Sequence, residues 1–211
     1  KGVALEKNVL FENWVDTEQI FPLNEKPGLY QELGLPENRT IILYSGNMGE
    51  KQGLEIIVEA ARSLKERTDL LFVLCGTGSA KDRLINLTQG FENVVFFPLP
   101  PIDRLNELLN LADIHLLPQK VDAEDLVMPS KLTNMMASGK AVVATVSENS
   151  QIGNVLVVCG VVVEPENVEA FCNAIKSLVD NPDDARRLGG NCRQYVELHW
   201  SKYDVLAKVF A

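Results

Sequence analysis

The feature that most constrains this chain is an alternation that begins at Thr40. Short, wholly apolar runs alternate with longer segments whose apolar residues recur at helical spacing. Runs of this kind are typical of strands buried on both faces of a parallel sheet covered by helices. The sequence therefore predicts an α/β fold, a doubly wound Rossmann-like parallel sheet of about six strands flanked by helices. The predicted strands are 41–44, 70–75, 94–97, 114–118, 141–145 and 161–163.

The intervening segments predict helices, and the last of them spans 183–210. An interruption is expected there at Gly189 and Gly190, because glycine weakens a helix. This last stretch carries more apolar residues than one face needs, so part of its apolar surface is expected to be exposed. Residues 147–153 form a polar segment after the strand at 141–145.

The first 39 residues show no long periodic segment and contain turn-forming residues such as Pro27 and Pro36. We interpret 1–39 as a linker and N-terminal extension, and 40–211 as one domain with C-terminal helices. The net charge of −9 argues against a nucleic-acid partner, which favours a basic surface. The only histidines, His115 and His199, lack partners at metal-ligand spacing, so no metal site is expected.

A strand–loop–helix–strand unit over residues 112–145 places a polar loop after the run at 114–118. The loop contains Glu124 and Asp125, and a helix opens at Met128, Pro129, Ser130 and Lys131. Ligands of open parallel sheets bind at this edge, and a helix N-terminus offers unpaired N–H groups to an anion. We therefore expect the binding site here, although a charged loop is also the usual form of a solvated connection.

Two glycine-containing loops are expected at the same edge. The first contains Gly46, Asn47, Met48 and Gly49, followed by Lys51 and Gln52. Its glycines allow close approach of the backbone, and Lys51 could reach a phosphate, but an ordinary turn with a solvated lysine would look the same.

The second loop contains Gly76 and Gly78, which match the start of the dinucleotide pattern G-x-G-x-x-G. The third glycine is replaced by Lys81, and no carboxylate ends the next strand. A nicotinamide cofactor is therefore not expected.

The ordered set of motifs resembles the C-terminal half of GT-B glycosyltransferases, and more narrowly the retaining group 1 (family 4) enzymes, including those of the colanic-acid and exopolysaccharide type. The resemblance covers about residues 13–180. The matching motifs are Asn13-Trp14-Val15-Asp16, the glycine loops at 46–53 and 75–78, Pro129-Ser130-Lys131-Leu132 and Ala137-Ser138-Gly139-Lys140.

This resemblance implies a domain that binds a nucleoside diphosphate sugar. Asn47, Met48 and Lys51 or Gln52 would face the diphosphate, and Gly46 and Gly49 belong to the same loop. Gly76 and Gly78 would line the cleft, Leu99 and Pro100 would lie near the base, and Met128, Pro129 and Ser130 would offer N–H groups to the phosphate. Lys51 and Glu124 are the candidate catalytic residues, and Asp125, Lys131 and Asn134 complete the binding set.

The chain departs from the family pattern at several of these positions. Asn47 stands where the family often has arginine, and Gln52 stands at the usual lysine position, with Lys51 one place early. In the E-x7-E pair the second glutamate is Asn134 and the first is Leu126, although Glu124 and Asp125 are close. Asn134 can still hydrogen-bond a ribose hydroxyl, but without charge.

The resemblance further implies a hexosyltransferase that needs no cofactor beyond its donor and works at the cytoplasmic side, where peripheral membrane contact of the intact enzyme is left open. A glycan or lipid-linked acceptor would bind mainly to a separate N-terminal domain before Lys1, so the isolated 211 residues are expected to be inactive. Two alternatives stay open. The domain could belong to a GT-B sugar-nucleotide epimerase, or it could be a non-catalytic nucleotide-binding or scaffold domain whose site has decayed. The sequence does not identify the sugar, the base or the acceptor.

Overall fold

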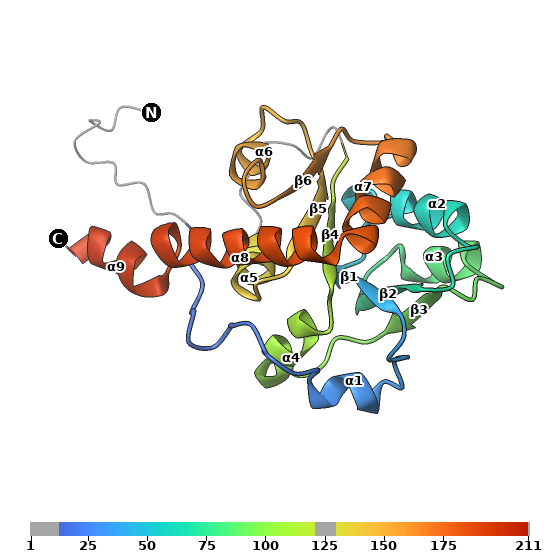
Figure 1. Ribbon diagram of the computed structural model, residues 1–211, viewed down its shortest axis with the longest axis horizontal. Coiled ribbons are helices and arrows are strands. Elements are labelled where there is room, and N and C mark those ends of the chain that lie inside the picture. Colours follow the sequence, from blue (N-terminus) through green and yellow to red (C-terminus); the bar gives the residue numbers. More distant parts are fainter. Residues whose placement is uncertain (1–12, 121–129, 211) are drawn as a thin grey trace.

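The computed structural model describes residues 13–120 and 130–210. Six parallel strands form one sheet in the order β3-β2-β1-β4-β5-β6, with helices on both faces (Figure 1). This is the strand order of a doubly wound Rossmann-like domain, and it confirms the predicted fold class. The strands are β1 (Thr40–Asn47), β2 (Leu70–Thr77), β3 (Val94–Phe97), β4 (Ile114–Pro118), β5 (Ala141–Thr145) and β6 (Gly160–Val163).

Short helical elements connect most of the strands. In chain order the helical elements are α1 (Gly28–Glu32), η2 (Glu50–Gln52), α2 (Glu55–Ser63), α3 (Lys81–Leu87), η3 (Ile102–Arg104), α4 (Leu105–Asn110), α5 (Ser130–Ala137), α6 (Gln151–Leu156), α7 (Val168–Asp180), α8 (Pro182–His199) and α9 (Lys202–Phe210). None of the helices in the described segments is both long and apolar enough to cross a membrane.

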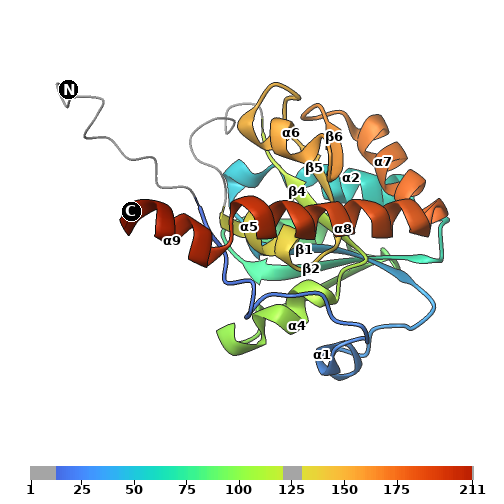
Figure 2. The ribbon, with the colours of Figure 1, turned by 60° about the vertical axis from the view of Figure 1, so that its left-hand side comes forward.

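The two faces of the sheet are buried by separate sets of helices because strand side chains point alternately to opposite faces. In β1, Ile42 and Tyr44 pack with α2, α3 and α7, whereas Ile41 and Leu43 pack with α1 and α4. On this second face α5 and α8 cover β4 and β5, and Figure 2 shows α8 lying across the front of the domain. Burial on both faces explains why these strands contain almost no polar side chain.

The C-terminal helices differ from the sequence prediction. The expected interruption at Gly189 and Gly190 is wrong, because α8 runs through both glycines. Gly189 lies against the backbone of Gly139, where a Cβ atom would come within 2.2 Å of the Gly139 carbonyl oxygen. The break comes at Trp200 and Ser201 instead. As expected, part of the apolar surface is exposed, including Leu198 and Tyr203.

The N-terminal described segment is hydrogen-bonded to the residues on either side of the break between α8 and α9. Val15 donates its N–H to the carbonyl of Trp200 at 3.0 Å, and its own carbonyl accepts from the N–H of Lys202 at 3.0 Å. The ammonium of Lys202 also forms an ion pair with Asp16 at 3.0 Å and lies over the ring of Trp14. Residues 14–16 and the start of α9 therefore form one unit.

Candidate functional site

The strand order reverses direction between β1 and β4, and their carboxyl ends define the place where such sheets bind ligands. The connection after β1 passes to one face of the sheet, and α5, which follows β4, packs on the other. Lys131, on the first turn of α5, extends back to the end of β1, so that a Cβ atom on Gly46 would lie 4.0 Å from its Cδ. The two loops thus form one crevice.

Lys131 is the central charge of this crevice. Its ammonium donates to the side-chain oxygen of Gln52 at 3.4 Å and lies 5.0 Å from the centre of the Tyr44 ring. Burial lowers the pKa of Lys131 to about 8, because the surroundings disfavour its charged form. No carboxylate forms an ion pair with it within residues 13–120 and 130–210. A poorly solvated cation without an acidic partner favours an anionic ligand.

Tyr44 and Asn47 fix the shape of the loop beside Lys131. The Tyr44 hydroxyl donates to the carbonyl of Asn47 at 2.6 Å, and burial raises the pKa of this phenol. The tyrosine therefore stays neutral, holds the end of β1 and offers its ring face to Lys131. The side chain of Asn47 is exposed at the crevice.

The glycine pair at the end of β2 has a packing role in this structure. A Cβ atom on Gly76 would lie 2.0 Å from the Gly46 carbonyl oxygen, and one on Gly78 would lie 2.4 Å from that of Met48. Gly78 also has a φ of +154°. Met48 is fully buried, accepts from the Ala80 N–H and donates to Thr77. The two glycines thus let the ends of β1 and β2 touch.

Lys51, the sequence candidate for phosphate contact, lies exposed on η2. Gln52, the next residue, turns toward Lys131. Within η2 the side chain nearest the crevice is therefore the amide and not the lysine. Gly49 caps η2 and its carbonyl accepts from the Gln52 N–H at 3.1 Å.

A groove of about 510 Å³ lies beside the crevice, and Asn134 lines it. Asn134 follows Lys131 by three positions, so the two side chains share one face of α5. The opposite walls come from the N-terminal segment, with Trp14, and from Ile102, which is 83% exposed. An amide and two large apolar side chains therefore face a hollow about one helical turn along α5 from the half-buried Lys131.

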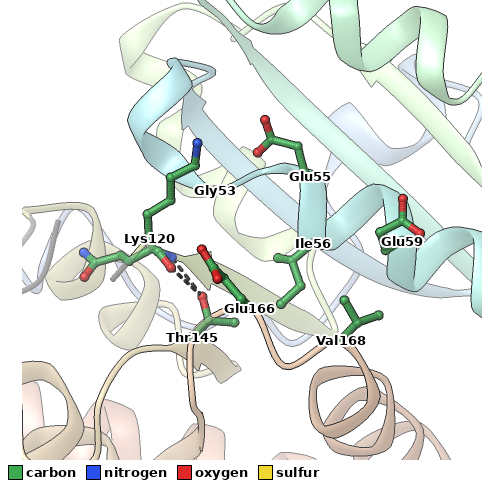
Figure 3. Close-up of a pocket in the computed structure, with 9 residues that line it drawn as sticks. Gly53, Glu55, Ile56, Glu59, Lys120, Thr145, Glu166 and Val168 are labelled. Atoms are coloured by element: carbon green, nitrogen blue, oxygen red, sulfur yellow. Dashed lines mark hydrogen bonds between the residues drawn. The ribbon is translucent and has the colours of Figure 1, made fainter. Parts of the chain in front are cut away.

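A smaller cavity of about 240 Å³ opens on the other side of the β1 loop, between the starts of α2 and α7 (Figure 3). Ile56 and Val168 form its apolar floor, and the side chains of Lys120, Glu55 and Glu166 stand around its rim. Glu166 has a φ of +64°, a conformation that favours glycine. The nearby Thr145 hydroxyl accepts from the Gln119 N–H and donates to the Gln119 carbonyl, which fixes the end of β4.

The remaining predicted residues fall into two groups. Glu124, Asp125, Met128 and Pro129 lie outside the described residues. Ser130 is the first residue of α5, while Leu99 and Pro100 follow β3 at the same edge of the sheet, with Leu99 exposed. The structure brings Gly46, Asn47, Gln52, Ser130 and Lys131 to neighbouring positions around the crevice, while Asn134 lines the groove one helical turn further along α5.

Sequence reasoning did not identify Tyr44, Trp14, Ile102 or Lys120 as side chains of these hollows. Tyr44 lies inside an apolar run, and Ile102 follows a proline-rich turn, so neither carries a local signal. Lys120 lies two residues after the end of β4, and its position near the strand's carboxyl end was the available signal.

Comparison with known proteins identifies the family. Residues 26–195 match the family described as glycosyl transferases group 1, and the chain belongs to this family. It is 39% identical over 216 residues to the putative colanic acid biosynthesis glycosyl transferase WcaI of Escherichia coli, an alignment that covers 98% of this chain and 51% of WcaI. The chain thus spans about half the length of the curated relatives it matches.

Solved structures show the same fold. The C-terminal domain of the group 1 glycosyl transferase LpcC from Francisella tularensis superposes with a TM-score of 0.74 at 20% identity, over 89% of this chain and 99% of that one. Anabaena Alr3699/HepE, crystallised in complex with UDP-glucose, superposes with a TM-score of 0.81 at 18% identity, over 99% of this chain and 58% of that one. The domain therefore has the architecture of one half of a GT-B enzyme.

Proposed function

We propose that this domain binds a nucleoside diphosphate sugar and serves as the donor half of a retaining glycosyltransferase. The observation that carries the proposal is Lys131, a poorly solvated ammonium without a described acidic partner at the switch point of the sheet. In the intact enzyme, a sugar would pass from this donor to a glycan or lipid-linked acceptor held mainly by a second domain.

The crevice suits a diphosphate. Lys131 would supply a positive charge, Gln52 and Asn47 would supply amide donors, and α5 begins at Ser130 with its free N–H groups beside them. A phosphate between these groups would give the ammonium the anionic partner that burial otherwise withholds. When the donor bond breaks, negative charge develops on the leaving diphosphate, and the same ammonium would stabilise it.

The groove suits the nucleoside. Asn134 lies about one helical turn beyond Lys131, so a ribose joined to the diphosphate would meet its amide. Trp14 and Ile102 would contact the flat base with apolar surface. The ion pair between Lys202 and Asp16 and the Lys202–Trp14 contact hold the indole at the groove before any ligand arrives.

The comparisons support this assignment at the level of the fold. The Anabaena protein was crystallised in complex with UDP-glucose, and its fold covers nearly all of this chain. Relatives in Escherichia coli and Pseudomonas aeruginosa are described as glycosyltransferases. The chemistry at Lys131 is what connects these likenesses to a site in the present chain.

Calorimetric titration with UDP and with GDP tests the proposal and identifies the base. We expect Lys131→Met to weaken the preferred nucleotide by roughly 10- to 100-fold, the effect of a lost charge-assisted hydrogen bond. Lys51→Met tests the sequence-based assignment in parallel, and Lys65→Met, at an exposed position on another part of the surface, is the matched control.

Loss of binding in Lys131→Met alone would assign the phosphate to Lys131, and loss in Lys51→Met alone would return it to the β1 loop. If neither nucleotide binds to this chain or to the intact protein, the result favours the alternative of a non-catalytic domain whose nucleotide site has decayed. Epimerisation of the sugar nucleotide by the intact protein, without transfer, would favour the epimerase alternative.

A further inference from the structure

A second large hollow lies at the opposite edge of the sheet. It has a volume of about 840 Å³ and is lined by residues at or just before the first residues of four strands, namely Thr40, Asp69, Ile114 and Lys140. The crevice at Lys131 lies at the carboxyl ends of the same sheet, roughly 25 Å away for an eight-residue strand such as β1. We refer to this hollow as the amino-edge groove.

Basic side chains gather in the amino-edge groove, although the whole chain carries a net charge of −9. Five cationic residues line it against three acidic ones. The cations come from the segment before β1, from the start of β5 and from α8, so that three separate parts of the chain contribute. They are Lys26, Arg39, Lys140, Arg186 and Arg193.

Several of these cations keep their charge unneutralised. Lys26 donates to the Glu37 carbonyl at 3.3 Å, and Arg39 donates to the Glu92 carbonyl at 3.0 Å. Backbone carbonyls satisfy the donors but carry no net charge. The side chain of Lys140 forms no hydrogen bond or ion pair with any residue of the described segments. Arg186 is ion-paired with Asp183, and Arg193 with Glu197 at 2.6 Å, so the charge available to a ligand comes from Lys26, Arg39 and Lys140.

Two of the acidic residues are already occupied. Asp69 accepts both arms of the Arg67 guanidinium at 2.8 and 2.7 Å, and this arginine is not part of the lining. Asp113 accepts the Ile41 N–H at 2.8 Å. Each carboxylate has further lone pairs that can accept a hydroxyl group. The lining thus combines charge for an anion with acceptors for hydroxyls.

Gly190 adds an observation of a different kind. It lies in the middle of the 18-residue α8, where glycine costs helix stability relative to alanine. Unlike Gly189, which contacts Gly139, a Cβ atom on Gly190 would meet no atom within 4 Å. Packing within the described residues therefore does not explain this glycine, and its bare backbone opens into the groove. A ligand that approaches the helix backbone closely would explain it.

We propose that the amino-edge groove binds a saccharide that carries an anionic group, either a phosphate or a carboxylate. Lys140 and Arg39 hold the anion, while Asp113 and Asn38 take hydroxyl groups. The volume fits a mono- or disaccharide of this kind. Because the groove and the crevice lie at opposite edges of the sheet, both can be occupied at once, and this site is separate from the one proposed for the donor.

Titration of the full chain with glucose 1-phosphate and with glucuronate tests the proposal, with glucose and inorganic phosphate as controls. Each titration is run with and without saturating UDP. We expect one of the two anionic sugars to bind, glucose and phosphate alone to bind at least about tenfold more weakly, and UDP to change the affinity less than about twofold. The better of the two sugars identifies the anionic group.

Three variants locate the ligand. Lys140→Gln should weaken binding by about tenfold or more, and the matched Lys65→Gln, at a 68% exposed side chain, should leave it unchanged. Gly190→Gln places a side chain in the groove while improving a helical position, so binding should fall as the melting temperature holds or rises. Misfolding cannot produce that opposite pair of effects.

Three results would overturn the proposal. They are failure of both anionic sugars to bind at about 10 mM, displacement of the bound sugar by UDP, and unchanged affinity in Gly190→Gln. Inorganic phosphate binding as tightly as the sugar phosphate would be a fourth such result, because the saccharide would then add nothing to the affinity.

Discussion

The lowered pKa of Lys131 makes a measurable prediction about nucleotide binding. With a pKa of about 8 in the free protein, about 90% of the lysine is charged at pH 7, about half at pH 8 and about a quarter at pH 8.5. A bound diphosphate raises this pKa, since it favours the charged form. Binding therefore takes up a proton, and the affinity falls as the pH rises through 8.

The magnitude follows from these fractions. If only the ammonium form binds well, the dissociation constant for UDP or GDP rises about fourfold between pH 7 and pH 8.5, and about half a proton is taken up per ligand at pH 8. The ligand contributes little, because the terminal phosphate loses its last proton near pH 6. Calorimetry in two buffers of different ionisation enthalpy measures the proton uptake directly.

Lys131→Arg provides the control, because a guanidinium stays charged at every pH used. Its affinity should be flat between pH 7 and pH 8.5, and any titration of the base itself would appear equally in both proteins. A wild-type affinity that is also flat, with no proton uptake at pH 8, would refute the assignment of the phosphate to Lys131.

Three further predictions concern stability, all measured by urea unfolding. Gly189→Ala should destabilise the fold by several kcal/mol, because its Cβ would meet the backbone of Gly139, while the adjacent Gly190→Ala should stabilise it by up to about 1 kcal/mol; equal effects would contradict the packing described. Glu166→Asn should stabilise by roughly 0.5–1 kcal/mol, since asparagine tolerates a positive φ better; a loss of stability would show that the Glu166 side chain matters more. Burial lowers the pKa of His115 to about 3. Between that pH and about 6.5, the unfolded state therefore binds a proton that the folded state does not. The free energy of unfolding attributable to this residue falls as the pH drops through this range, by up to about 1.4 kcal/mol per pH unit. The free energy of unfolding of His115→Gln should fall less steeply over that pH range. Parallel pH dependences of the wild type and the variant would exclude the histidine as the cause.

The strands could be predicted because burial on both faces leaves a direct mark in the sequence. The ends of the strands could not be predicted. The apolar run of β1 stops at Tyr44, yet the strand continues to Asn47, since Gly46 pairs with Gly76 on β2. Two glycines in register allow the backbones to approach closely, and this pairing depends on a residue 30 positions away. A local pattern holds no information about such a contact.

Helix boundaries failed for a related reason. Residues 147–153 are only a polar segment in the sequence pattern, yet α6 begins at Gln151 and is capped by the Ser150 side chain, which accepts the Gly153 N–H at 3.0 Å. In α8, glycine propensity indicated a break, but the contact between Gly189 and Gly139 offsets the propensity. A local cap starts α6, whereas tertiary packing carries α8 through its glycines.

The sequence indicates the edge of the sheet at which the candidate site lies, but it does not rank Lys51 and Lys131 within that site. Both Lys51 and Lys131 follow a strand and lie near the start of a helical element, so their positions in the sequence do not distinguish them. What separates them is solvation, because Lys51 is exposed while Lys131 lies between the Tyr44 ring and Gln52. Solvation depends on neighbours from three elements, which a sequence pattern does not combine.

The bonding of Val15 to Trp200 and Lys202 has a mechanical consequence. Residues 14–16 and the start of α9 cross the surface side by side, joined by two backbone hydrogen bonds, an ion pair and the Lys202–Trp14 contact. A displacement of either segment is therefore transmitted to the other. Since Trp14 also lines the groove beside Asn134, displacement of α9 would tilt the indole and change the width of that groove.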